Sequence, residues 1–400
     1  MAEPKIRFKK DDGSYFPEWE NIPMSDIFTE ISEKNHPEMQ VLSVQQGVGT
    51  VFRDSSDRNI SYDKSNLKNY KAMKKDDFII HLRSFEGGLE CSNYDGISSP
   101  AYRILRSKAI LPEAYRDYFR SHEFIHNKLA VSVVGIRDGK NIDMDTFWQI
   151  PIPVPCLEEQ QKIADFLSTV DEIISTSEQE VANLDAQKKA VMKKIFSQEV
   201  RFKRDDGTNY PEWEEKMINE VSDISGGKTP SMNNASFWNN PSVNWISSKD
   251  MKTGRISKSE MQISEKAAKT MKVYKKGTVL VVVRSGILKH SLPVAVLEEE
   301  STINQDIKAF EVYGCNSEYF AYFIKAQEPV IIREYVKKGT TVQSIQIDDL
   351  IKMMIPIPCL AEQHRITDFL SDFDEAIATA KKELELWKEL KKGLLQQMFV

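Results

Sequence analysis

Apolar residues recur every seven positions along two stretches of the chain, one beginning at residue 163 and the other at residue 366. In each stretch they form two rows that a helix would place along one face, a pattern typical of helices that pair side by side. We therefore predict two long helices that form an antiparallel coiled coil within one chain; the alternative is that each helix packs only on its own domain. The predicted seam consists of Ile163, Leu167, Val170, Ile174, Val181, Leu184, Val191 and Ile195 in the first helix, and of Ile366, Leu370, Phe373, Ile377, Leu384, Trp387, Leu394 and Met398 in the second.

The two heptad patterns also share their interruptions. Ser177 and Ala380 are both small, and lysine occupies the same seam position at Lys188 and Lys391. Shared interruptions favour pairing of the two helices over independent packing. At about 1.5 Å per residue, roughly 35 helical residues span about 50 Å, so we expect the pair to act as a rigid spacer.

The rest of the sequence predicts mixed α/β (α+β) structure. Apolar runs at 78–82, 279–283 and 307–312 indicate strands, and residues 112–130 and 317–337 have the spacing of amphipathic helices. The prolines of 151–155 indicate an extended segment, because proline disfavours helical geometry in the residue before it. We expect core positions for Tyr115, Tyr118, Phe119, Tyr319, Phe320, Phe323 and Ile324.

The chain contains an internal repeat. The sequence IRFKKDDGSYFPEWE at 6–20 recurs as VRFKRDDGTNYPEWE at 200–214, and residues 152–168 recur at 355–371. Between these markers the two copies look unrelated, which indicates one scaffold presenting two different surfaces. We predict domains at 1–150 and 200–354, with spacer helices at 151–199 and 355–400. Pseudosymmetry also places residue 6 near the end of the last helix, because residue 200 directly follows the first.

Composition narrows the class of protein. A hydrophobic content of 40% and a charged content of 28% are ordinary for a soluble globular protein. No stretch approaches the roughly 20 apolar residues of a membrane span, and four scattered cysteines without a Cys-x-x-Cys pair fit a reducing cytoplasm. The net charge of −6 means that any positive charge facing an anionic ligand is local.

Motifs for catalysis are missing. Residues 226–229, Gly-Gly-Lys-Thr, resemble the end of a phosphate-binding loop, but serine stands at 222 where the leading glycine belongs. There is no G-x-G-x-x-G fingerprint, no Asn-Pro-Pro-aromatic signature of adenine methyltransferases, and no histidine spacing for zinc. We therefore expect a binding protein without cofactor or metal, and not an enzyme.

Several motifs resemble those of the specificity subunits of type I restriction-modification enzymes. Each copy ends in Ile-Pro-x-Pro, Glu-Gln and Ile-x-x-Phe-Leu followed by a long helix, and the resemblance covers essentially the whole chain. The second copy contains several segments similar to the usual opening of a target-recognition domain. They are residues 224–230, 245–250, 276–279, 283–286, 304–306 and 338–343. The first copy lacks the Gly-Lys-Thr-Pro opening but keeps the Leu-Arg-Ser motif at 82–84 and the Pro-Ala-Tyr motif at 100–102.

The resemblance implies a non-catalytic subunit located in the cytoplasm. Each variable domain would read one half of a bipartite double-stranded DNA target, and the helix pair would set the gap between the halves. The chain would hold two methyltransferase (M) subunits and, in the restriction complex, the ATP-dependent restriction (R) subunits. S-adenosylmethionine, ATP and Mg would be bound by those partners.

Side chains that could contact DNA follow from this resemblance and from base chemistry. Lysines at 64, 68, 71, 74 and 75 and at 266, 269, 272, 275 and 276 form two local clusters suited to phosphates, unless they are only solvated surface. Base reading requires groove-facing polar side chains. Our candidates are Arg83, Ser84, Tyr102 and Arg137 in the first copy, and Lys228, Thr229, Lys249, Arg284, Ser285, Thr340, Thr341 and Gln343 in the second.

The sequence argues against three other functions. A DNA-binding scaffold without sequence preference would have two similar middles, and a methyltransferase or nuclease acting alone would need a cofactor or metal motif. A coiled-coil interaction protein without a DNA role would leave the lysine clusters and the two divergent domains unexplained.

Overall fold

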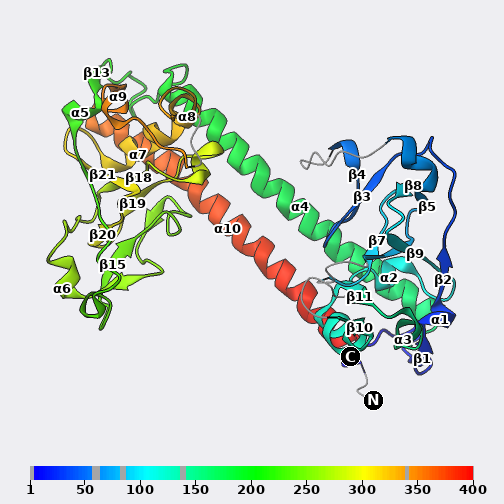
Figure 1. Cartoon of the computed structure of the whole chain (residues 1–400). Helices are drawn as coiled ribbons and strands as arrows, with labels where there is room; N and C mark the ends of the chain where they lie inside the picture. The colour runs from blue at the N-terminus through cyan, green and yellow to red at the C-terminus, as the bar shows by residue number, and fades with distance from the viewer. Residues whose placement is uncertain (1–3, 56–63, 82–86, 136–140, 338–341, 400) are drawn as a thin grey trace. The chain divides into compact units, whose positions relative to one another are not determined.

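The computed structural model describes residues 4–55, 64–81, 87–135, 141–337 and 342–399 (Figure 1). The chain divides into two compact units. The first unit comprises Met1–Gln179 and Lys381–Val400, and the second comprises Glu180–Ala380. Each unit therefore contains one of the predicted domains together with a part of each long helix.

The two predicted long helices are confirmed. Helix α4 spans Leu157–Phe196 and helix α10 spans Leu360–Met398, directly after the proline-rich segments (Figure 1). At about 1.5 Å per residue, each is roughly 60 Å long. Every residue of the predicted seam is buried or half-buried.

Ion pairs join the two helices inside each unit, and the two pairs of the first unit show that the helices run antiparallel there. In the first unit, Lys391 Nζ lies 2.6 Å from Asp171 Oδ1, and Lys388 Nζ lies 2.9 Å from Glu178 Oε1. In the second unit, Lys188 Nζ lies 2.5 Å from Asp374 Oδ1. The lysines that interrupt the heptad pattern are therefore cross-helix contacts.

The central sheet of the first unit is antiparallel, with the strand order β2-β9-β6-β7. Its register places Phe78 of β6 opposite Leu105 of β9. Phe78 and Phe119 are fully buried and pack edge to face, with ring centroids 5.1 Å apart. The strands are β2 (Phe28–Ile31), β9 (Tyr102–Ser107), β6 (Phe78–His81) and β7 (Glu90–Cys91).

The second unit repeats this topology despite its different sequence. Its larger sheet has the order β14-β21-β18-β19-β16, and Val279 of β18 faces Phe310 of β21 as Phe78 faces Leu105. A smaller sheet has the order β17-β15-β20. The strands are β14 (Ser222–Gly226), β21 (Ile307–Val312), β18 (Val279–Val282), β19 (Val294–Leu297), β16 (Arg255–Ile256), β17 (Gln262–Ile263), β15 (Val243–Ile246) and β20 (Ser301–Ile303).

The shorter elements lie around these sheets. Strands β5 and β8 pair with each other, as do β3 with β4 and β10 with β11. Their bounds are β3 (Leu42–Gln45), β4 (Gly49–Phe52), β5 (Lys71–Met73), β8 (Gly96–Ser98), β10 (Val133–Val134) and β11 (Asn141–Ile142), and those of the short helices are α1 (Met24–Ile27), α3 (Met144–Trp148), α5 (Ile218–Val221), α6 (Glu265–Ala268) and α9 (Ile347–Leu350).

The predicted helices at 112–130 and 317–337 are wrong in their continuity. The first is broken into α2 (Pro112–Tyr115), two 3-10 turns and a π-helical turn at Glu123–Lys128, because the backbone is extended at Ser121. The second is divided into α7 (Ser317–Ala326) and α8 (Glu328–Glu334), with proline near the start of α8. The core prediction is confirmed, since all seven aromatic and aliphatic residues named for it are buried.

The repeated opening segments, residues 6–20 and 200–214, hold each domain to the first turn of a long helix. Glu159 of α4 is fully buried and accepts from Arg7 Nη2 and Trp19 Nε1, each at 2.9 Å. The same carboxylate raises the pKa of Arg7. The second copy repeats the arrangement with Glu362, Arg201 and Trp213.

Each opening segment continues into a strand that pairs with the proline-rich segment before the helix. Strand β1 (Glu20–Pro23) pairs antiparallel with β12 (Pro151–Val154), and β13 (Glu214–Met217) pairs with β22 (Met354–Ile357). These contacts give the similar ends of the two copies a common structural role.

The pseudosymmetry prediction for the two ends of the chain is confirmed within the first unit. The backbone N–H of Ile6 donates to the carbonyl of Gln397 at 3.2 Å, as Val200 donates to Lys194 at 3.1 Å in the second unit. Phe399 is buried against Trp19 and Tyr118, so the last turn of α10 completes the core of the first unit.

Candidate nucleic-acid interface

The segment after β14 is fixed against the segment after β20 in the second unit. Gly227 lies so close to Ile303 that an added Cβ would be 1.9 Å from the Ile303 carbonyl oxygen. Lys228 N–H donates to that same carbonyl at 3.1 Å, and Thr229 Oγ1 donates to Gln305 Oε1 at 2.6 Å. Lys228 and Thr229 are both exposed. A glycine is therefore required at 227 for this approach, which holds the Lys228 backbone against Ile303 and the Thr229 side chain against Gln305.

The end of β18 joins the same cluster. The backbone carbonyl of Asp306 accepts from the N–H groups of Val283 and Arg284, at 2.8 and 3.2 Å. Ser285 N–H donates to the carbonyl of Gln343 at 3.0 Å. The structure thus brings together five predicted contact residues from distant parts of the sequence, namely Lys228, Thr229, Arg284, Ser285 and Gln343.

Lys249 lies on a turn at the same edge of the small sheet. Ile246 of β15 pairs in parallel with Ile303 of β20, so the segments following the two strands leave the sheet on the same side. Ser247 and Asp250 form the turn, with Ser247 N–H and Oγ both 2.8 Å from Asp250 Oδ2. The Lys249 side chain is exposed.

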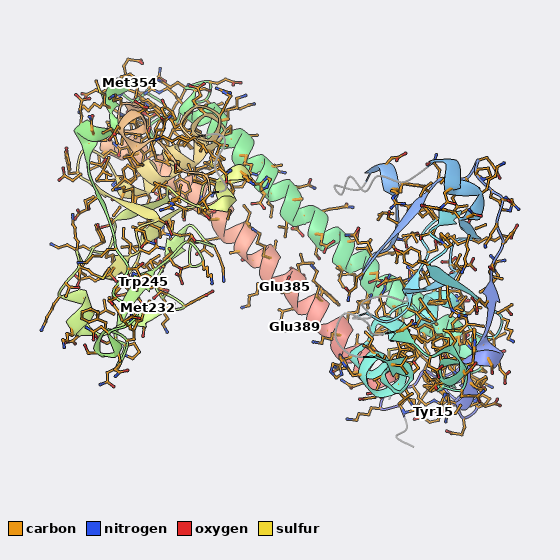
Figure 2. The ribbon with its side chains drawn as sticks, viewed as in Figure 1. Tyr15, Met232, Trp245, Met354, Glu385 and Glu389 are labelled. Carbon is orange, nitrogen blue, oxygen red and sulfur yellow. The ribbon has the colours of Figure 1, made fainter. Side chains whose placement is uncertain are left out.

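Two tryptophans anchor the loop that carries Lys228. Trp245, labelled in Figure 2, donates from Nε1 to the carbonyl of Lys228 at 3.2 Å. Trp238 donates to the carbonyl of Ser231 at 3.1 Å and packs edge to face with Trp245. Both ends of the exposed segment are therefore held in place, which limits the conformational entropy lost on binding.

The candidates of the first unit are mostly outside the described residues. Arg83, Ser84 and Arg137 fall there, as do Thr340 and Thr341 of the second unit. Tyr102 begins β9 and is half-buried, and burial raises its pKa.

The lysine clusters have a mixed role. In the second unit Lys266, Lys269, Lys275 and Lys276 are exposed. Lys272 is exposed as well, but it pairs with Glu311, which raises its pKa, and it lies over the Tyr274 ring. In the first unit Lys71 Nζ donates to the Tyr102 carbonyl at 2.8 Å, so this lysine stabilises the fold.

Gln305 was not among the sequence candidates although it lies within the cluster. The sequence feature that could have identified it is the Asn-Gln-Asp motif at 304–306, of which it is the middle residue. The hydrogen bond with Thr229, which identifies it as part of the cluster, joins residues far apart in the sequence and becomes visible only in the fold.

The cluster is rich in polar and cationic side chains. Its exposed cations, hydroxyl and amide groups match the side chains that contact phosphates and base edges. Across the described ranges, no group of three or more His, Cys, Asp or Glu side chains is placed to hold a metal ion. The helices in the same ranges include none that is both long and apolar enough to cross a membrane.

Two topologically equivalent α+β domains, each continuing into a long helix, define the class of protein. The model of the family described as the type I restriction modification DNA specificity domain matches residues 17–185 and 210–386. The chain belongs to this family, as its repeated motifs indicated.

Curated relatives are specificity subunits. The chain is 32% identical over 246 residues to the specificity subunit of type I restriction enzyme EcoR124I/EcoR124II of Escherichia coli, covering 59% of each. It is 31% identical over 215 residues to the MjaIX specificity subunit of Methanocaldococcus jannaschii, covering 51% of this chain and 48% of that protein. The MjaVIII specificity subunit of the same organism is 23% identical over 97% of this chain and 94% of its own length.

Solved structures share the fold. A chain from a type I R-M system structure matches with a TM-score of 0.58 at 18% identity, covering 96% of this chain and 97% of that one. The type I restriction-modification S subunit from M. genitalium matches with a TM-score of 0.55 at 13% identity, covering 100% and 99%.

Proposed function

We propose that this chain is the non-catalytic DNA-specificity subunit of a type I restriction-modification complex, and that each unit reads one half of a bipartite target. The observation that carries the proposal is the common strand order of the two units, combined with different residues in the segments that follow equivalent strands. Reading two different half-sites requires one scaffold with two different sets of exposed polar groups. A DNA-binding scaffold without sequence preference would not need the exposed groups of its two units to differ.

The repeated parts support a role in assembly. The opening segments and helix starts are closely similar in the two copies, so two copies of one partner could dock in equivalent ways. We assign that position to two methyltransferase (M) subunits, with the restriction (R) subunits joining the complex that cuts DNA. S-adenosylmethionine, ATP and Mg would be bound by those partners, and this chain would contribute DNA recognition.

The test is co-expression with a matching methyltransferase subunit in a host without adenine methylation, followed by modification-sensitive sequencing. We expect one split motif, methylated on both strands. Replacing residues 20–150 with the domain of another family member should change one half of that motif only. A change in both halves, or a complex that methylates no split motif, would contradict the proposal.

The helix pair is proposed to set the gap between the half-sites. Deleting the equivalent heptads 178–184 and 381–387 together shortens both helices by ~10 Å, which corresponds to ~3 base pairs. The gap should shorten, while the half-sites stay the same. Deleting either heptad alone is the matched control, since it breaks the antiparallel alignment and should impair assembly. An unchanged gap in the double deletion would refute the spacer role.

A further inference from the structure

A β-hairpin in the first unit was not among the sequence candidates, yet its tip is fixed by contacts from a neighbouring strand. The hairpin consists of β3 and β4, joined by residues 46–48. The Asn93 side-chain amide donates to the carbonyls of Val48 and Thr50, at 2.9 and 3.0 Å. The Thr50 and Ser92 hydroxyls lie 3.0 Å apart and are buried.

A buried ion pair anchors the turn itself. Glu90 is 7% exposed and accepts from the Gly47 N–H at 2.8 Å. Its other carboxylate oxygen lies 2.6 Å from Arg120 Nη2. The carboxylate therefore links the turn backbone at Gly47 to Arg120, which compensates its buried charge. At Gly49, φ is +102° and an added Cβ would be 2.3 Å from the Cys91 carbonyl oxygen, so the hairpin approaches β7 more closely than any other residue would allow.

The side chains at this rigid tip face outward. Gln45 is exposed, and Val48 is 46% exposed. A two-stranded β-ribbon fits the major groove of DNA, where a glutamine amide pairs with adenine N6 and N7 and an apolar side chain contacts the thymine methyl group. An amide at the end of β3 and an isopropyl group on the adjoining turn therefore match one A·T-containing step.

Topology gives an independent reason to assign Gln45 to recognition. Val41 forms a parallel bridge with Ile97 in the first unit, and Trp245 pairs in parallel with Thr302 in the second. Ile97 precedes the start of β9 by the same number of residues as Thr302 precedes the start of the equivalent strand β21. Gln45 follows Val41 at the spacing by which Lys249 follows Trp245. Both side chains are exposed, and they differ in chemistry; Gln45 ends a strand, whereas Lys249 lies in a turn.

We propose that the β3–β4 hairpin inserts into the major groove of the first half-site, where Gln45 reads an adenine and Val48 contacts a neighbouring thymine methyl. The inference rests on the proposed function and deepens it by naming a base and the residues that read it. It adds a reader to the first unit, formed entirely by described residues.

The test uses the complex of the full chain with its methyltransferase subunits. Methylation rates are measured on duplexes that differ by one base pair at each position of the target. Gln45→Ala should reduce discrimination for adenine at one position of the first half-site by about 5- to 150-fold, the range for loss of one bidentate base contact. Gln45→Lys, which introduces the residue of the second unit, should shift the preference at that position from adenine to guanine.

Gln179→Ala is the matched control, because it removes another exposed glutamine of the first unit, on α4, and should leave every preference unchanged. A split target whose first half is read identically by the wild type, Gln45→Ala and Gln45→Lys would overturn the hairpin assignment and leave the proposed function intact. Changes spread over both half-sites would also overturn it, since they indicate a general structural effect. A wild-type complex that methylates no split target would overturn the proposed function and this inference together.

Discussion

Lys391 on α10 lies 2.6 Å from Asp171 on α4, and its pseudosymmetric counterpart Lys188 on α4 lies 2.5 Å from Asp374 on α10. Each lysine sits at the seam position where the heptad pattern would otherwise have an apolar residue. A polar residue at a seam position fixes the register of paired helices at some cost in stability. The two ion pairs therefore select one antiparallel register inside each unit.

The two lysines should differ in their contribution to stability. Lys391 also pairs with Asp117 at 2.6 Å, and the side chains of both are only 16% exposed. Lys391→Ala should lower the free energy of unfolding of the first unit by about 3 kcal/mol, the low end of the range for a broken buried ion pair, since it leaves a largely buried carboxylate without its partner. Lys188→Ala leaves Asp374 without its partner, but that carboxylate is 50% exposed, and the variant also loses a cation–π contact with Tyr322. We therefore expect the free energy of unfolding of the second unit to fall by only about 1 kcal/mol.

Hydrogen–deuterium exchange of peptides from each unit measures the two effects separately. The opposite order of the two variants, or equal effects, would contradict the burial argument.

Phe399 should stabilise the first unit although it lies at the far end of the sequence. It is 2% exposed and its ring centroid lies 4.8 Å from that of Tyr118. Phe399→Ala should cost about 3–5 kcal/mol, as for other buried aromatic truncations, and accelerate exchange throughout the first unit only. Phe196→Ala is the matched variant, because Phe196 packs on Tyr319 in the second unit and should affect that unit alone. A Phe399→Ala protein that exchanges like the wild type would refute this account of the core.

The main features of the fold were predictable because they rest on periodic or repeated sequence. The heptads predicted α4 and α10, and the apolar runs predicted β6, β18 and β21. The recurrence of residues 6–20 indicated a common structural role, which the Arg7–Glu159 contact explains.

The candidate site was only partly predictable, because its geometry depends on contacts between distant residues. A run of lysines does not show which side chain turns inward, and Lys71 is bonded to the Tyr102 carbonyl. The helix predicted at 112–130 is interrupted by the extended backbone at Ser121, which the apolar spacing does not reveal. The β3–β4 hairpin depends on Glu90, Asn93 and Arg120, none of them close in sequence to the tip they hold.

The thiols of Cys91 and Cys315 should be unreactive in the folded protein. Burial raises the pKa of each to about 12, so at pH 8 only about one molecule in ten thousand carries the thiolate that attacks alkylating reagents. Because the pKa is raised, reactivity should increase with pH towards 12, provided that the fold persists. Alkylation by iodoacetamide followed by mass spectrometry should label both cysteines slowly in native protein and rapidly in urea. Equal rates in the two conditions would contradict the burial of these thiols.

Gly227 should be essential for reading the second half-site. Its backbone conformation is open to any residue, so the constraint is space alone: a Cβ would be 1.9 Å from the Ile303 carbonyl oxygen. Gly227→Ala must displace the segment carrying Lys228 and Thr229 from Gln305. We expect discrimination in the second half-site to fall about tenfold or more, on the order of one lost base contact, with the first half-site unchanged.

Gly254→Ala is the matched control, because an added Cβ there meets no atom within 4 Å. Both variants are assayed in the methyltransferase complex on duplexes altered in one half-site at a time, and hydrogen exchange of the second unit reports whether its core persists. If Gly227→Ala reads the second half-site as Gly254→Ala does, the segment after β14 does not contact bases. If discrimination falls while exchange in the core stays at the wild-type rate, the loss arises from the displaced Lys228 and Thr229 side chains.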